Sequence, residues 1–303
     1  MKNIDTINKL IQLEKKYFKY FYKSDFDFRE SITMRIFNEV IKKNSIFTKK
    51  IKSMKICFPY SSKISSEFLL SHEKSPDHIW EPQTHKLLNL LCKNGKNVIF
   101  GGAFFGDHAC LLAKKFSKTK MYCFEPVKKQ RMFLRKNKML NNLNNLFISD
   151  KALFNKKNLK IYIKENKIDD GDISLVKQKN KDGKYFLTET LDHFSFINKM
   201  NAIEILMIDV EGNELNVLLG AIKLLKDKKI KNIIFEIHSK YVNWSKGLIK
   251  TKIIKLLLKL GYKVFVIRDY HSNKKMKNKI ELLNLKKTFL KGPTHGFNLI
   301  ATL

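Results

Sequence analysis

Residues 205–214 read Ile205-Leu206-Met207-Ile208-Asp209-Val210-Glu211-Gly212-Asn213-Glu214, an apolar run that ends in acids and leads into a helical pattern. Continuous apolar residues of this length are typical of a buried strand in a parallel sheet. Because residues i and i+2 of a strand point to the same side, we expect Asp209 and Glu211 to lie together at the carboxyl end of this strand. A later run ends in Glu236-Ile237-His238. If the two strands are neighbours, four titratable groups converge at the edge where open α/β sheets bind ligands.

From residue 97 onward, short apolar runs alternate with helical periods, which predicts an α/β fold with a parallel sheet and crossover helices. The predicted strands are Val98–Phe100, Lys120–Phe124, Leu146–Ser149, Ile203–Ile208, Ile230–Ile237, Val264–Arg268 and Phe297–Thr302. The predicted helices are Asp107–Phe116, Val127–Asn141, Asn213–Lys226 and Leu248–Leu260. We interpret the polar segment 155–184 as an insertion, and its Asp169-Asp170-Gly171-Asp172 as a solvated turn rather than a calcium loop.

Three parts are expected along the chain. Residues 1–50 form a helical appendage, with amphipathic stretches over 4–22 and from Ser31 to Asn44. We expect these helices to pack on the protein's own body or on a second subunit rather than on an anionic membrane. Residues 51–95 form an irregular connecting segment, broken by prolines and suited to capping a substrate, and residues 96–303 form the main domain.

The chain of 303 residues carries 60 Lys+Arg and 28 Asp+Glu, a formal net charge of +32. Five of the 60 basic residues are Arg, and the lysines are spread from end to end, which is typical of a compositional bias rather than of a phosphate-binding surface. Nucleic-acid binding is therefore not favoured, although the charge permits it. Apolar residues at 44% and aromatics at 12% exclude intrinsic disorder for most of the chain.

The four cysteines show no Cys-x-x-Cys spacing, and the sequence has neither a leader pattern nor an apolar run long enough to span a bilayer. We therefore expect a cytoplasmic protein with no transmembrane segment.

A glycine-rich turn follows the first predicted strand of the main domain and reads Gly101-Gly102-Ala103-Phe104-Phe105-Gly106-Asp107. Such a turn lets the backbone approach a ligand and presents a helix N-terminus to it. Glu125 lies 23 residues after Gly102, at the end of the next strand, where a carboxylate can hold the two hydroxyls of a ribose. Together these features indicate a cofactor that contains a nucleoside. The alternative for Glu125 is a carboxylate that caps the helix at Val127.

These motifs, with Phe124-Glu125-Pro126, Asn137 through Asn144, Lys151-Ala152-Leu153, Thr190-Leu191-Asp192 and the 208–215 box, resemble the FkbM-type methyltransferases over roughly residues 95–240. The resemblance implies a class I methyltransferase fold, Rossmann-like, with a seven-stranded sheet and an antiparallel last strand at Phe297–Thr302. It also implies S-adenosylmethionine as cofactor and a hydroxyl oxygen, often on a sugar of a glycan, as acceptor.

The same resemblance implies that Gly102, Ala103 and Gly106 line the cofactor, that Glu125 holds its ribose, and that Asp150 contacts the adenine amine. The alternative for Asp150 is an ordinary turn residue. This chain departs from the family pattern at Phe100, where Asp is usual, and at Phe104, where Asn is usual.

An alcohol is a poor nucleophile at neutral pH, so a base near the acceptor oxygen is expected. His238 is the first choice because its usual pKa lies near neutrality. Asp209 and Glu211 would orient His238 or the acceptor, or one of them would itself be the base. These residues and Glu236 are also hard-ligand types, but their spacing lacks a metal signature, and we expect no metal.

The sequence thus predicts an S-adenosylmethionine-dependent O-methyltransferase that acts on a hydroxyl of a sugar or glycan precursor. Two alternatives stay open. In the first, the acceptor is an RNA hydroxyl, which the positive charge permits. In the second, the chain is a degenerate relative that binds cofactor or a partner without turnover, which Phe100 and Phe104 suggest.

Overall fold

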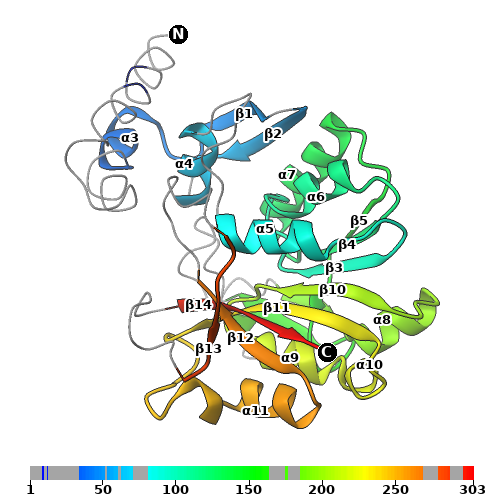
Figure 1. Cartoon of the computed structure of the whole chain (residues 1–303). Helices are drawn as coiled ribbons and strands as arrows, with labels where there is room; N and C mark the ends of the chain where they lie inside the picture. Colours follow the sequence, from blue (N-terminus) through cyan, green and yellow to red (C-terminus); the bar gives the residue numbers. More distant parts are fainter. Residues whose placement is uncertain are drawn as a thin grey trace. The chain divides into compact units, whose positions relative to one another are not determined.

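The computed structural model describes residues 9, 12, 34–51, 53–60, 63–70, 81–163, 175–176, 185–268, 279–286 and 296–303. The chain divides into two compact units, one of residues 1–85 with 270–279 and the other of 86–269 with 280–303 (Figure 1). The turn predicted at 169–172, and most of the helix predicted over 4–22, lie outside the described residues. The three-part division of the sequence stays a prediction.

The second unit is built on an eight-stranded sheet in the order β13-β12-β14-β11-β10-β3-β4-β5 (Figure 1). The strands from β11 to β5 run parallel, and β14 is antiparallel to both of its neighbours. In that order they are Leu282–Asn284, Lys263–Ile267, Gly296–Thr302, Ile230–His238, Ile203–Ile208, Asn97–Gly101, Lys120–Phe124 and Leu146–Ser149. The seven strands from β12 to β5 match the predicted class I arrangement, because β14, the antiparallel strand, lies between β12 and β11. The extra strand β13, which no pattern predicted, pairs with β12 at the edge.

Helices cover both faces of this sheet. In Figure 1, α6 and α7 lie on one face, and α8, α9, α10 and α11 lie on the other. They span Ala109–Lys115, Lys128–Leu140, Leu191–Ile197, Glu214–Leu219, Ile222–Lys226 and Lys252–Lys259, and the short 3-10 turn η2 spans Leu248–Lys250. All six residues of β10 are buried, as expected for a strand covered on both faces.

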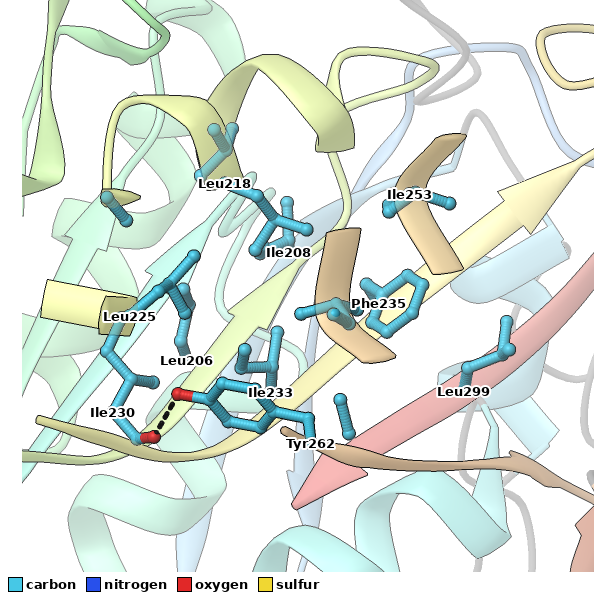
Figure 2. Close-up of a cluster of buried hydrophobic side chains, with 14 of the residues drawn as sticks. Leu206, Ile208, Leu218, Leu225, Ile230, Ile233, Phe235, Ile253, Tyr262 and Leu299 are labelled. Carbon is cyan, nitrogen blue, oxygen red and sulfur yellow. Dashed lines mark hydrogen bonds between the residues drawn. The ribbon is translucent and has the colours of Figure 1, made fainter. Parts of the chain in front are cut away.

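The main core lies between the sheet and the helices on the α9 and α11 side (Figure 2). Leucine, isoleucine and phenylalanine side chains fill it, and Tyr262 is buried among them. The Tyr262 hydroxyl donates to the Ile230 carbonyl oxygen at 2.7 Å, so its polar end is satisfied inside the core. Burial of this cluster stabilises the packing of α9 and α11 on the sheet.

The single helix predicted over Asn213–Lys226 is two helices, α9 and α10, which meet at Gly220. A Cβ at Gly220 would lie 2.0 Å from the Phe154 carbonyl oxygen, so the backbones approach closely at this break. Asp192 then caps α10, because its two carboxylate oxygens accept the backbone N–H groups of Lys223 and Leu224, both at 3.0 Å.

A second, four-stranded sheet has the order β6-β9-β7-β8. Its strands are Ala152–Leu153, Tyr185–Glu189, Lys160–Ile163 and Leu175–Val176. Two of them, β7 and β8, lie in the segment 155–184, which the sequence predicted as an insertion and in which no strand was predicted. Each strand is short, and the antiparallel pairing of Ile161 with Phe186 joins residues far apart in sequence.

The first unit contains α3 (Met34–Val40), the hairpin of β1 (Ile46–Ile51) and β2 (Met54–Pro59), and α4 (Lys63–Leu70). The irregular segment predicted over 51–95 is therefore wrong at the hairpin and at both helices that follow. Pro59 ends β2, and Pro82 is the first residue of α5 (Pro82–Leu91), in which the boundary between the units falls. Proline is tolerated at both kinds of position, so it marks ends here rather than disorder. Among the described helices, none is long and apolar enough to cross a bilayer.

Candidate active site

The glycine turn and the acidic box meet through their backbones. The Asp209 N–H donates to the Gly101 carbonyl oxygen at 2.9 Å. Gly102 has φ +79°, and a Cβ on it would lie 1.7 Å from the Asp209 carbonyl oxygen. The contact occurs where β3 has β4 on one side and β10 on the other, which is the crevice that binds ligands in open α/β sheets.

The turn after Gly102 is held from several sides. The N–H groups of Gly102 and Ala103 donate to the Phe124 carbonyl oxygen at 3.0 and 3.3 Å. Gly106 has φ +89°, and a Cβ there would lie 2.4 Å from Cys110 Sγ. The glycines at 102 and 106 are therefore required by the packing of the chain on itself.

The two departures from the family pattern have different settings. Phe100 is buried within β3, where it belongs to the core. Phe104 has φ +47°, a left-handed conformation in which Asn is tolerated far better than Phe, and its ring packs on Phe105 with centroids 4.7 Å apart. The usual Asn at this position thus has a backbone reason, which Phe104 does not satisfy.

Glu125 stands at the end of β4 with 3% of its surface exposed. One carboxylate oxygen, Oε2, accepts the Phe104 N–H at 2.8 Å, and the other, Oε1, accepts the Val127 N–H at 2.9 Å. Burial raises the pKa of Glu125 to about 7, against the lowering effect of these N–H groups and of Arg131. The helix-capping contact is present, and two of the roughly four acceptor positions of the carboxylate are used by it and by Phe104.

Arg131 fixes the segment around Glu125. Its Nη1 donates to the carbonyl oxygens of Glu125 and Pro126, both at 2.7 Å. Burial lowers the pKa of the Arg131 guanidinium, and the Asp150 charge acts in the opposite direction. Asp150, exposed after β5, therefore lies within electrostatic reach of Arg131 and of this turn. No sequence pattern predicted a role for Arg131 at this site.

The acidic box does not continue the strand. β10 ends at Ile208, and Glu211 has φ +51°, so the assumption of extended backbone through Asp209 and Glu211 is wrong. Glu214 shapes this reversal, because its buried Oε1 accepts the N–H groups of Val210 and Gly212 at 3.2 and 3.1 Å. Burial raises the pKa of Glu214. Glu214 is thus a structural residue of the box.

Tyr241 is the residue of this edge that sequence reasoning missed. Its hydroxyl donates to Glu211 Oε2 at 3.2 Å. Its ring covers Gly212, where a Cβ would lie 2.5 Å from the ring. The sequence signal for Tyr241 was its place three positions after His238. Its contact with Glu211 could not be predicted from that, because Tyr241 and Glu211 are 30 positions apart.

β10 and β11 are neighbours, with Ile208 opposite Phe235, so the expected juxtaposition of their carboxyl ends is confirmed. A Cβ on Gly296 would lie 3.0 Å from Glu236 Oε1 and 3.2 Å from His238 Cδ2, which puts both side chains beside this glycine.

The His238 ring also lies 5.9 Å from the Tyr241 ring. Its Nδ1 accepts the Lys240 N–H at 3.1 Å, so a neutral His238 carries its proton on Nε2.

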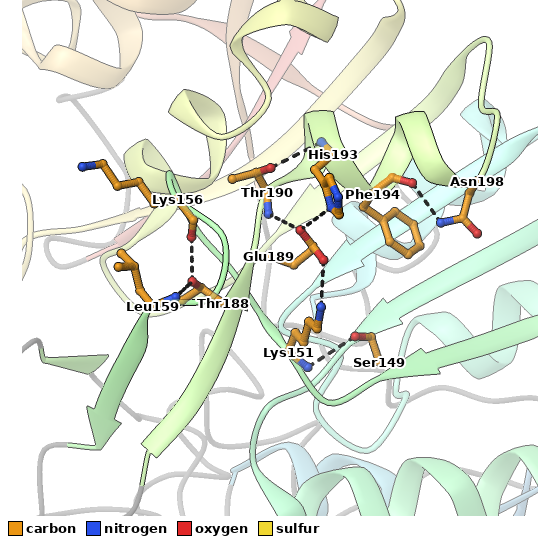
Figure 3. A network of polar contacts seen from close by, with 10 residues as sticks. All are labelled: Ser149, Lys151, Lys156, Leu159, Thr188, Glu189, Thr190, His193, Phe194 and Asn198. Carbon is orange, nitrogen blue, oxygen red and sulfur yellow. Dashed lines mark hydrogen bonds and ion pairs between the residues drawn. The ribbon is translucent and has the colours of Figure 1, made fainter.

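Two other family motifs hold the fold together (Figure 3). Glu189 is buried and accepts from the Thr190 N–H at 3.0 Å and from Lys151 Nζ at 2.9 Å, with His193 Nδ1 3.0 Å away. Burial raises the pKa of Glu189, but these partners outweigh that effect and the pKa is lowered. Thr190 caps α8 by accepting the His193 N–H. Among the residues the structure describes, no group of three or more His, Cys, Asp or Glu side chains is placed to hold a metal.

The family model for the FkbM methyltransferase domain matches residues 101–264, more than half of the chain. The chain belongs to the FkbM methyltransferase family. The predicted class I fold is confirmed, and S-adenosylmethionine is the cofactor of this FkbM methyltransferase.

No protein of curated function matches the chain in sequence. Solved structures resemble it distantly. Precorrin-6y C5,15-methyltransferase from Geobacter metallireducens has 11% identity and a TM-score of 0.39, over 72% of this chain and 86% of that one. An rRNA methylase from Streptococcus thermophilus has 12% identity and a TM-score of 0.39, over 72% and 93%. TYW2 from M. jannaschii in complex with AdoMet has 13% identity and a TM-score of 0.39, over 86% of each chain.

Gly102→Ala tests the contact between the two motifs. The new Cβ cannot fit against the Asp209 carbonyl, so we expect the free energy of unfolding to fall by about 3 kcal/mol or more. Gly95→Ala is the matched control, because Gly95 has φ +77° with open space around it and should lose about 1 kcal/mol. Equal losses in denaturant unfolding would contradict the close approach.

Glu125 predicts a pH dependence of stability. Its pKa is about 7 in the folded chain against a usual value of 4.5, so folding is favoured by the bound proton. That contribution is complete below about pH 4.5 and is lost as the pH rises through about 7, a change of roughly 3 kcal/mol. We expect the unfolding free energy of the wild type to decline, relative to Glu125→Gln, across this interval. Parallel curves for the two proteins in urea would refute the assignment.

Proposed function

We propose that this FkbM methyltransferase transfers a methyl group to a hydroxyl of a sugar or glycan precursor. The observation that carries the proposal is the pairing of the Tyr241 hydroxyl with Glu211, next to His238 and at the edge shared by β10 and β11. Carboxylate, phenol and imidazole groups recognise the hydroxyls of a carbohydrate by hydrogen bonds.

The residues at the switch point fit the cofactor. Glu125 is a buried carboxylate with acceptor capacity beyond its two backbone contacts, which suits the hydroxyls of a ribose. We assign Gly102, Ala103 and Gly106 to the wall of the cofactor site and Asp150 to the adenine amine. Arg131 would keep Glu125 and Pro126 in place by its two bonds to their carbonyl oxygens.

When bound, S-adenosylmethionine supplies an electrophilic methyl group. The chain must then hold the acceptor hydroxyl and take its proton. We assign the removal of this proton to a carboxylate, either Glu211 or Asp209. His238 donates a hydrogen bond from Nε2, because its Nδ1 already accepts the Lys240 N–H. His238 as the base, the first expectation from the sequence, would require this contact to break.

Tyr241 positions Glu211. The ring lies on Gly212, so the phenol is held where it donates to the Glu211 carboxylate. This bond fixes the orientation of the Glu211 carboxylate. The expected partner of the protein is a small-molecule or glycan acceptor. Four buried free cysteines agree with the cytoplasmic setting that we propose.

Cofactor binding is tested by calorimetric titration with S-adenosylmethionine and S-adenosylhomocysteine at pH 8. We expect saturable binding to the wild type, and binding weaker by about tenfold or more in Glu125→Gln, which loses a charge-assisted hydrogen bond. Glu204→Gln is the control. Glu204 is also buried, but it lies near the amino end of β10, whereas Glu125 follows the carboxyl end of β4. An unchanged affinity in Glu125→Gln would remove Glu125 from the site. A wild type that binds neither compound would favour the degenerate alternative and implicate Phe100 and Phe104.

Methyl transfer is tested by mass spectrometry of sugar nucleotides, oligosaccharides and RNA incubated with the protein and S-adenosylmethionine. We expect a gain of one methyl group on a carbohydrate hydroxyl, with kcat lower by about tenfold and KM little changed in Tyr241→Phe. Tyr185→Phe, in β9, should behave as the wild type. An unchanged kcat in Tyr241→Phe would contradict its positioning role. Methylation of RNA alone would replace the proposed acceptor class.

A further inference from the structure

The helix α7 and its flanks form an acid-free segment. Residues 126–149 contain neither Asp nor Glu. Six basic residues lie on α7 itself, and two of the five arginines of the chain are among them. They are Lys128, Lys129, Arg131, Arg135, Lys136 and Lys138. Arg131 bonds to the carbonyl oxygens of Glu125 and Pro126, whereas Arg135 is exposed on the surface of the helix.

One face of α7 is committed to the fold. Its buried residues are Gln130, Phe133, Leu134 and Asn137. Asn137 also donates to the Phe105 carbonyl oxygen at 2.9 Å, which ties this face to the glycine turn. The opposite face of the helix is therefore turned away from the sheet.

Two methionines form the centre of that opposite face. Met132 is 54% exposed and Met139 is 69% exposed. Seven residues bring a helix back to within about 20° of its starting direction, so the two side chains lie in one line along α7. By the same helical spacing, Arg135 falls on one side of this line and Lys136 on the other, both exposed. We call this the α7 crest: Met132 and Met139 flanked by Lys128, Arg135 and Lys136.

An apolar line with cations on both sides matches one kind of partner. Thioether side chains enter the boundary between headgroups and acyl chains, while Lys and Arg beside them reach anionic headgroups. A nucleic acid would instead place its phosphates on the centre of the face, where this helix presents uncharged methionines. We propose that the α7 crest docks the protein on an anionic phospholipid surface. This inference is independent of the acceptor and of the catalytic assignments.

Vesicle sedimentation tests the docking surface. The full chain is mixed with phosphatidylcholine vesicles that contain or lack phosphatidylglycerol, and the bound fraction is measured. We expect binding that requires phosphatidylglycerol and weakens with salt. The triple variant Lys128→Glu, Arg135→Glu, Lys136→Glu should bind at least about tenfold more weakly. The control triple Lys252→Glu, Lys255→Glu, Lys259→Glu changes three exposed lysines of α11 and imposes the same charge change. This control variant should lose far less vesicle binding than the α7 triple variant.

The apolar part of the crest has its own test. Met132→Gln with Met139→Gln leaves the charge unchanged and should weaken vesicle binding several-fold, whereas the exposed pair Leu219→Gln and Leu258→Gln should not.

Circular dichroism and urea unfolding check that each variant retains its fold. Absence of vesicle binding by the wild type would overturn the proposal, as would equal losses in the two charge triples. Tight binding of single-stranded RNA that is insensitive to the methionine change would assign the crest to nucleic acid instead.

Discussion

The approach of two backbones at Gly102 and Asp209 is the constraint around which the site is arranged. It leaves no volume for a side chain at residue 102, and it joins the end of β3 to the end of β10. The direction of the following turn then brings the Phe104 N–H to Glu125. Glu125 in turn begins α7 through Val127, so one contact sets the position of the glycine turn, the Glu125 carboxylate and the helix beyond it.

The residues that define the family motifs divide into two groups by what they touch. Thr190 and Asp192 accept backbone N–H groups at the N-termini of α8 and α10, and Glu214 accepts those of the turn before α9. Glu211 instead contacts the side chain of Tyr241. The first group stabilises the fold, and Glu211 is the acid of the box to which we assign a role in the reaction.

The sequence was sufficient for the main sheet because its strands are long apolar runs separated by helical periods. It was insufficient where strands are short, as at β7 and β8, or where the paired residues are far apart in sequence, as Ile161 and Phe186 are. At the site, Asp209, Glu211 and His238 were predicted as candidate residues because they follow or end apolar runs. The partnership of Glu211 with Tyr241 could not be predicted, because it depends on the left-handed turn at Glu211 and on the absence of a side chain at Gly212.

The capping role of Asp192 has a consequence for the history of such chains. Natural selection for a stable fold alone would preserve Asp192 and Glu214, since losing either leaves backbone N–H groups of α10 or of the 210–212 turn without their acceptors. If Glu211 and Tyr241 serve methyl transfer as we propose, a lineage that stopped transferring methyl groups would keep Asp192 and Glu214 and lose the Glu211–Tyr241 pair. On that proposal, the presence of the carboxylate and the phenol together distinguishes active relatives from inactive ones.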